Sequence, residues 1–418
     1  MKVIALFSPC LHAPDRRPAT LSTARVAMLR ATRRIALALT VATSAFTAQA
    51  AALAVDTLTV QSTARHAGGG GGSAPGRIEM PFVKSSDVAL ARRINHALFI
   101  QKYLALAPDK PQGRVGRADG VESEGVEYES FEMLRNDGRV FSLAFEGDSC
   151  GAYCEEYRSA YAFDARQGWL LTPENLFTPA GLRAVADRMA RKAPAQYRAQ
   201  LRTLAAELRA TQKSTAPAAA KADRISDIEE RIAFNETCLE ERAQATDADP
   251  ALFAWELHTT TLRITTSRCS NHAMRALDDV GAVTWSPTYA QLAPWLTAYG
   301  KQLLTGAGDG GASPAETLFE QVLYGELVSA AGARLPITAW LSVHKDGSVS
   351  GTYFYDRMRR PIELMGRWEG DWLVLGEQAG DAAGAGGSKA VFRLQRMGSG
   401  GFVGRWEGAA LMEVRLGR

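Results

Sequence analysis

The 418-residue chain is 46% hydrophobic and 22% charged, a composition that indicates a folded globular protein rather than a disordered or fibrous one. Its formal net charge is +3, but the first 50 residues hold seven Lys or Arg and one acidic residue, so 41 basic and 44 acidic residues remain after them. Such a slightly acidic chain lacks the long-range attraction that drives nonspecific nucleic-acid binding, and we expect no nucleic-acid partner.

An N-terminal leader is the first predicted element. After a basic segment, an uncharged run at residues 35–47 ends at the small-residue motif Ala48-Gln49-Ala50. This order predicts a secretory signal peptide over residues 28–50, with residues 1–27 produced by a start codon assigned too early. The apolar run is too short for a membrane anchor, so we expect an exported protein, periplasmic or secreted, with no transmembrane anchor.

A tether and two folded regions are expected to follow. Residues 51–76 include the string GGGGGSAPG, whose backbone freedom predicts a flexible tether, so the folded part should begin near Arg77. About 340 residues then remain, which is the length of two ordinary domains. A glycine-rich segment before Ser313-Pro314 separates a first region at 77–305 from a second region at 315–418.

The first region mixes helical and strand patterns. Ser85 or Ser86 is positioned to cap a helix that ends near Tyr103. Strands at 126–134 and 140–145 flank the hairpin turn residues Asn-Asp-Gly, and a further strand follows. These patterns predict an α+β domain.

Two long helical patterns form a predicted insertion over residues 181–245. The first covers 179–213 and the second runs from about Ile225 to Glu241, with a loop between them. Both helices are charged on their outer faces, which is typical of a solvated surface.

Four cysteines remain after the leader, and an even number in an exported chain predicts two disulfides. Of the three pairings that four cysteines allow, we favour Cys150 with Cys154 and Cys238 with Cys269, because the first pair brackets a tight turn. The alternatives are a redox-active pair or a metal site. Redox pairs of the thioredoxin type have two intervening residues, and zinc needs neighbouring histidines at set spacing, so structural bridges are preferred.

One catalytic pattern is present around Ser149. Gly147-Asp148-Ser149-Cys150-Gly151 fits the G-x-S-x-G string of serine hydrolases, in which a strand precedes the nucleophile and a helix follows it. A second strand is expected to follow here, so Ser149 is kept only as an alternative. The histidines are scattered and form no H-x-H or H-E-x-x-H motif, so we expect no metal and no cofactor.

The second region reads as short alternating strands from Phe319 onward, with turns roughly every 8–12 residues, which predicts an antiparallel β meander or small barrel. The string GRWEG occurs at 366–370 and again at 404–408, and Gly351-Thr352-Tyr353 is a relaxed third copy. We interpret each Gly as the start of a strand or a bulge, with the aromatic residue pointing inward. This spacing loosely resembles that of calycin-type barrels.

A barrel of this size either fills its interior with side chains or encloses one small apolar ligand. Aromatic residues at alternating positions usually form a core, so we expect a filled interior and keep a ligand cavity as the alternative. The residues that decide between them are Tyr353, Tyr355, Trp368, Trp372 and Trp406.

Several motifs of the first region occur in the order seen in RsiV-like secreted domains. They are Arg92-Arg93-Ile94-Asn95, the hairpin RNDGRVFS, Gly151-Ala152-Tyr153, Tyr161-Ala162-Phe163-Asp164 and, more faintly, Tyr289-Ala290-Gln291-Leu292. The resemblance covers roughly residues 77–300 apart from the insertion. That family is found on a lysozyme-sensing anti-sigma factor and on some peptidoglycan deacetylases, so the resemblance implies a helix packed on an antiparallel sheet and a binding role.

Two functions are consistent with these observations. The preferred one is a noncatalytic, exported, envelope-associated binding protein whose partner is a cell-wall glycan such as peptidoglycan or a lysozyme-like protein. The alternative is a serine-dependent cell-wall hydrolase or esterase that uses Ser149. Replacing Ser149 by Ala would leave a binder intact and abolish an esterase.

Overall fold

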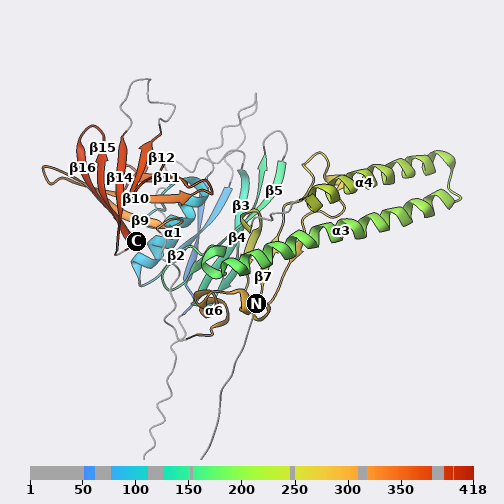
Figure 1. Ribbon diagram of the computed structural model, residues 1–418, viewed down its shortest axis with the longest axis horizontal. Helices are drawn as coiled ribbons and strands as arrows, with labels where there is room; N and C mark the ends of the chain where they lie inside the picture. The colour runs from blue at the N-terminus through green and yellow to red at the C-terminus, as the bar shows by residue number, and fades with distance from the viewer. Residues whose placement is uncertain are drawn as a thin grey trace, which may run out of the picture. The chain divides into compact units, whose positions relative to one another are not determined.

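The described residues form helices and three sheets, one of which closes into an eight-stranded antiparallel barrel (Figure 1). The predicted fold class, an α+β region followed by an all-β meander or barrel, is confirmed. The predicted signal peptide and residues 62–76 of the predicted tether lie outside the described residues. This computed structural model describes residues 51–61, 77–111, 126–150, 154–244, 250–308, 318–378, 390–398 and 400–418.

A five-stranded sheet forms the centre of the first region. Its strands are β1 (Ala54–Gln61), β2 (Arg77–Lys84), β3 (Val126–Asn136), β4 (Val140–Cys150) and β5 (Cys154–Asp164), in that spatial order. Neighbouring strands are antiparallel except β2 and β3, which run parallel. Helix α1 (Val88–Tyr103) packs against this sheet through Ile94 and Leu98, both of which are fully buried.

Two polar side chains fix α1 in place. Asp87, rather than the predicted Ser85 or Ser86, caps the helix, and its carboxylate accepts a hydrogen bond of 3.0 Å from a backbone N–H in the first turn. The buried side chain of Asn95 pairs with the backbone of Val83, accepting from its N–H at 2.8 Å and donating to its carbonyl at 2.9 Å. The helix is thereby tied to the end of β2.

Strand β1 corrects the predicted tether, because Ala54–Gln61 is paired rather than free. Leu58 lies opposite Met80 and Val60 opposite Ile78, and all four side chains are buried. This alternation of buried and polar residues is a strand pattern. This strand was not predicted from the sequence because residues 51–76 were treated as one segment, and the glycine run dominates the composition of that segment.

The predicted insertion is an antiparallel helical hairpin (Figure 1). Helix α3 (Pro179–Lys213) has the predicted bounds, whereas α4 (Ala218–Gln244) begins before the predicted Ile225, because three consecutive alanines favour helix. In the described part of the chain, no helix is both long enough and apolar enough to cross a bilayer.

Short elements complete the first region and pack with the N-terminal half of α3 around one cluster of buried side chains. They include a three-stranded sheet of β6, β7 and β8. The elements are α2 (Pro173–Leu176), η1 (Pro250–Leu252), β6 (Ala254–Leu257), β7 (Leu262–Thr265), η2 (Arg275–Leu277), β8 (Thr284–Trp285), α5 (Tyr289–Leu292), η3 (Ala293–Trp295) and α6 (Ala298–Thr305).

The second region is a closed barrel in which each strand pairs antiparallel with the next, and β16 pairs with β9 to close it. Eight strands leave an interior that side chains can fill. The strands are β9 (Val322–Ser329), β10 (Arg334–Val343), β11 (Ser348–Tyr355), β12 (Pro361–Glu369), β13 (Trp372–Glu377), β14 (Val391–Met397), β15 (Gly401–Glu407) and β16 (Leu411–Gly417).

The repeated GRWEG string marks places where neighbouring strands approach closely. A Cβ atom added to Gly366 would overlap the carbonyl oxygen of Val374, and one added to Gly404 would overlap that of Arg393. Trp368 and Trp406, two residues after each Gly, pack against the barrel core. The repeat is therefore a structural device of a tightly curved barrel rather than a site.

The outer wall of the barrel shares a hydrophobic cluster with α1. Val322, Trp340 and Phe354 belong to the same buried cluster as the core of the five-stranded sheet. The guanidinium of Arg359 also donates to the carbonyl oxygens that follow α1, including Leu106 O at 2.9 Å. The two predicted regions thus have a common core where they meet.

Acid should weaken this junction through His96. Burial, together with Arg359 and Arg92, lowers the pKa of His96 to about 3, so the folded state holds it neutral. Because the unfolded pKa is about 6.5, its contribution is present above that pH and falls as the pH drops, by about 2 kcal/mol between pH 6.5 and 4.5. Urea unfolding across this range should show that loss, and His96→Gln should flatten it. An unchanged pH slope in the variant would contradict this assignment.

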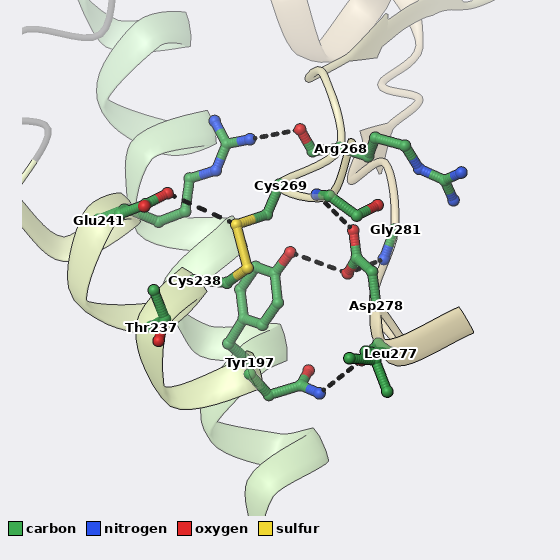
Figure 2. Close-up of a disulfide and its surroundings, with 12 residues drawn as sticks. Tyr197, Thr237, Cys238, Glu241, Arg268, Cys269, Leu277, Asp278 and Gly281 are labelled. Atoms are coloured by element: carbon green, nitrogen blue, oxygen red, sulfur yellow. Dashed lines mark hydrogen bonds between the residues drawn. A yellow bond between two sulfur atoms is a disulfide. The ribbon is translucent and has the colours of Figure 1, made fainter. Parts of the chain in front are cut away.

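Both favoured disulfides are present in the structure, Cys150–Cys154 and Cys238–Cys269. The second joins α4 to the segment after β7, and Figure 2 shows it beside a buried hydrogen-bonded loop. In that loop, Asp278 accepts hydrogen bonds from the Tyr197 hydroxyl at 3.1 Å and from the Gly281 N–H at 2.9 Å. The bridge therefore holds α4 and the loop together, and the Tyr197 hydrogen bond joins α3 to the same loop.

Removing this bridge should destabilise the protein. Replacing Cys238 and Cys269 by Ser frees a loop of 31 residues in the unfolded chain, which should lower the free energy of unfolding by about 3.5 kcal/mol. The same change at Cys150 and Cys154, which are only four residues apart, should cost about 2 kcal/mol. Urea titrations of the two variants measure the difference, and equal losses would contradict the loop-closure explanation.

Candidate functional site

An open pocket of about 520 Å³ lies at the end of the barrel where β12 turns into β13. Its volume falls within the roughly 300–1,000 Å³ range of small-molecule sites. The turn contributes Gly370 and Asp371, and the strands contribute the other side chains. The lining residues are Trp368, Gly370, Asp371, Gln395 and Arg396.

The register of three strands brings Trp368 and Arg396 to this rim. Phe392 and Leu394 of β14 are buried in the barrel core, and a period of two places Arg396 on the same face. Leu394 pairs with Leu373, which in turn pairs with Trp368. The two lining side chains therefore come from the last inward positions of their strands.

Aromatic rings form the floor beneath Arg396. The ring centroids of Trp368 and Phe402 are 6.5 Å apart, and those of Phe319 and Phe402 are 6.2 Å apart. The guanidinium carbon of Arg396 lies 5.1 Å from the Trp368 ring and 5.6 Å from the Phe319 ring. These cation–π contacts hold the guanidinium in place, and no ion pair to it occurs within the described residues.

The pocket combines three kinds of recognition chemistry. Trp368 offers apolar aromatic surface, Arg396 offers positively charged donors, and Asp371 and Gln395 add a carboxylate and an amide. Asp371 and Arg396 are exposed at the surface, so a ligand reaches them directly. This combination suits a polyhydroxylated ligand that presents both hydroxyl groups and C–H faces.

Only one of the five predicted cavity residues lines this pocket, namely Trp368. Tyr353 and Trp406 instead meet at Glu377, at the far end of β13, and both donate to its Oε1 atom, at 2.5 and 2.9 Å. Trp372 is 37% exposed and points away from the core. Tyr355 packs edge-on against Tyr353, with ring centroids 5.4 Å apart.

The barrel interior itself leaves little empty space. The cavity lined by Tyr353, Leu375, Phe392 and their neighbours measures about 10 Å³, which is about the space one water molecule requires. The alternative of an enclosed ligand cavity therefore lacks room, because large side chains from every strand meet in the centre. The available binding volume lies at the rim.

Ser149 lies on β4, in register with Glu155 of β5. The Cys150–Cys154 disulfide closes this hairpin, so the segment after Ser149 leads into a strand and not into the helix that a nucleophile elbow requires. Across the described ranges, no group of three or more His, Cys, Asp or Glu side chains is arranged to hold a metal ion.

A buried polar cluster centred on Glu129 escaped the sequence analysis. The Glu129 side chain is inaccessible to solvent and accepts hydrogen bonds from Lys102 Nζ at 2.5 Å, Tyr157 Oη at 2.5 Å and the Tyr103 hydroxyl. Burial, together with the Glu129 carboxylate, raises the pKa of Tyr103 and Tyr157 well above the usual value for tyrosine. Both phenols therefore remain protonated and can donate.

Gly147 makes this cluster sterically feasible. Glu129, Gly147 and Tyr157 lie in one row across β3, β4 and β5. A Cβ atom on Gly147 would lie 2.8 Å from the Tyr157 hydroxyl. Because glycine has no side chain, the hydroxyl can cross this position and donate to Glu129. All donors and the acceptor are internal, and we interpret the cluster as structural.

Comparisons with known proteins leave the family open. No protein-family model matches the chain, and no curated protein matches it. Solved structures of DUF3298-family proteins are similar, one from Bacteroides fragilis at 14% identity and a TM-score of 0.35, covering 60% of this chain and 95% of that one. A second, from Pseudomonas aeruginosa, has 11% identity and a TM-score of 0.31, covering 59% of this chain and 95% of that one. At these values the similarity assigns no function.

Proposed function

We propose that the chain is a noncatalytic, exported binding protein of the cell envelope, and that the barrel-end pocket binds a cell-wall glycan. The observation that carries the proposal is the convergence of Trp368 and Arg396, beside Asp371 and Gln395, in an open pocket of about 520 Å³. A sugar presents apolar C–H faces to an aromatic ring and hydroxyl groups to surrounding polar side chains. The pocket supplies both.

Two further observations support the export and binding parts of the proposal. Two disulfides are typical of proteins that fold in an oxidising compartment. The resemblance of residues 77–300 to RsiV-like domains favours binding over catalysis. We place the glycan contact in the barrel-end pocket, and we expect a lysozyme-like protein to contact the first region instead.

A pull-down of the oxidised protein tests the proposal against both partners. We expect the protein to bind purified peptidoglycan, and to lose that binding when Trp368 and Arg396 are replaced by Ala. Binding to lysozyme that survives these substitutions would favour the first region as the recognition surface instead. Binding to neither partner would contradict the proposal.

The serine-dependent alternative has its own test. Wild-type protein and Ser149→Ala are compared for hydrolysis of an activated ester and of peptidoglycan, with urea unfolding as the control for folding. We expect no turnover in either protein. Turnover that Ser149→Ala abolishes without loss of folding would establish the hydrolase.

A further inference from the structure

Helix α3 carries a row of basic side chains along its length. It contains eight Lys or Arg and only two acidic residues. Five of the cations recur at alternating spacings of seven and four residues, and eleven residues make about three helical turns. They therefore form one straight row about 33 Å long, the basic row, which consists of Arg191, Arg198, Arg202, Arg209 and Lys213.

The basic row faces solvent. All five of its residues are exposed, whereas the buried residues of α3, including Met189, Tyr197 and Leu204, lie on the opposite side of the helix. Between the cations the row has small side chains such as Ala195, Ala199 and Ala206. The charged groups are therefore the outermost feature of this face.

Among the described residues, these five cations form no ion pair. Of the two acids of α3, Glu207 points to the other side, where it pairs with Arg224 of α4, and Asp187 lies one turn before Arg191 at the N-terminal end of the row. Within the described residues, no member of the basic row forms an ion pair, although other arginines of this hairpin do so, as Arg231 does with Asp279 at 2.5 Å. The row is a line of five positive charges on a chain that is otherwise slightly acidic.

We propose that the basic row docks α3 onto the surface of an anionic lipid bilayer. A bilayer presents many negative charges in one plane, and a straight row of cations without protruding apolar side chains can contact them simultaneously. Each basic residue near such a surface increases the affinity by about fivefold, and the contributions of the five residues multiply. Because no aromatic or large aliphatic side chain lies within the row, docking is electrostatic and should be sensitive to salt.

Two other binding partners fit the basic row less well. A second copy of the chain could offer Glu229, Glu236 and Glu240 of α4, which are exposed and have the same spacing. Exposed ion pairs between helices contribute little each, so three of them would not hold two copies together. Nucleic acid is disfavoured because the two disulfides are typical of an oxidising compartment, where it is scarce.

Vesicle cosedimentation of the oxidised protein tests the proposal. Vesicles containing phosphatidylglycerol and phosphatidylcholine are compared with phosphatidylcholine alone at 20 and 300 mM NaCl. We expect binding to the anionic vesicles at low salt, at least tenfold weaker binding at high salt, and none to the neutral vesicles. Replacing four members of the row by Gln should weaken binding several hundred-fold, at about fivefold per charge. The variant changes Arg198, Arg202, Arg209 and Lys213.

A matched control variant distinguishes the effect of the basic row on vesicle binding from the effect of the protein's net charge. It neutralises four exposed basic residues outside α3 and should retain nearly all binding; these are Lys110, Arg357, Arg360 and Arg415. Equal losses in the two variants, or no binding of the wild-type protein at 20 mM NaCl, would overturn the proposal. Tighter binding to single-stranded DNA than to the vesicles would also overturn it, by assigning the row to nucleic acid. Trp368→Ala should leave vesicle binding unchanged, which separates this proposal from the glycan site.

Discussion

Replacing Glu129 by Ala should destabilise the protein by about 3–5 kcal/mol, because it leaves a nearly buried ammonium group and two phenols without their acceptor. The side chain of Lys102 is only 10% exposed, so water cannot replace the carboxylate without local opening. Urea unfolding at neutral pH measures the loss. A cost below 1 kcal/mol would show that solvent reaches the cluster.

The double variant Glu129→Leu with Lys102→Met provides the control for this prediction. Each single change leaves the other residue's buried charge without its partner, whereas the double change removes both charges. The double variant should therefore lose less free energy of unfolding than the sum of the two single variants. Additive losses would contradict a direct interaction between the two side chains.

Replacing Gly366 by Ala should destabilise the barrel by about 3 kcal/mol, since the added methyl group overlaps the Val374 carbonyl oxygen across the strand pair. The backbone itself must move, because no flexible side chain can yield at this position. The equivalent change at Gly404, which faces the Arg393 carbonyl oxygen, should have a similar cost. Thermal and urea unfolding would detect both losses.

Gly376 provides a matched control in the neighbouring strand. A Cβ atom there would lie 3.8 Å from the nearest heavy atom, an ordinary van der Waals contact, so Gly376→Ala should change stability by less than 1 kcal/mol. Equal effects at Gly366 and Gly376 would mean that loss of glycine flexibility, rather than the close strand approach, sets the cost.

Local patterns predicted much of the fold. The Asn136-Asp137-Gly138 turn was identifiable because Asp137 satisfies the backbone N–H groups of Arg139 and Val140, each at 3.0 Å, without help from the rest of the chain. Helix α3 was equally clear, since its apolar residues keep helical spacing over 35 residues. Short alternating strands joined by turns predicted a meander or small barrel, and the structure shows the closed form.

Features that depend on distant strands were not predictable in this way. The Glu129 cluster needs Gly147 and Tyr157 in the same row, which only the pairing of β3, β4 and β5 establishes. Arg396 continues the inward alternation of Phe392 and Leu394. A charged residue at an inward position of a strand could therefore have indicated a binding site from the sequence alone. Its convergence with Trp368 nevertheless depends on the register between strands.

Titration of the protein with soluble peptidoglycan fragments, followed by calorimetry, tests the glycan-binding proposal most directly. If the barrel-end pocket is the site, Trp368→Ala should weaken binding about 30-fold or more, the usual effect of removing a central aromatic contact. Trp372→Ala, which removes an exposed Trp from the same turn but not from the pocket lining, should leave affinity unchanged. Fragments that bind wild-type protein and Trp368→Ala equally well, with both proteins folded, would contradict the proposal.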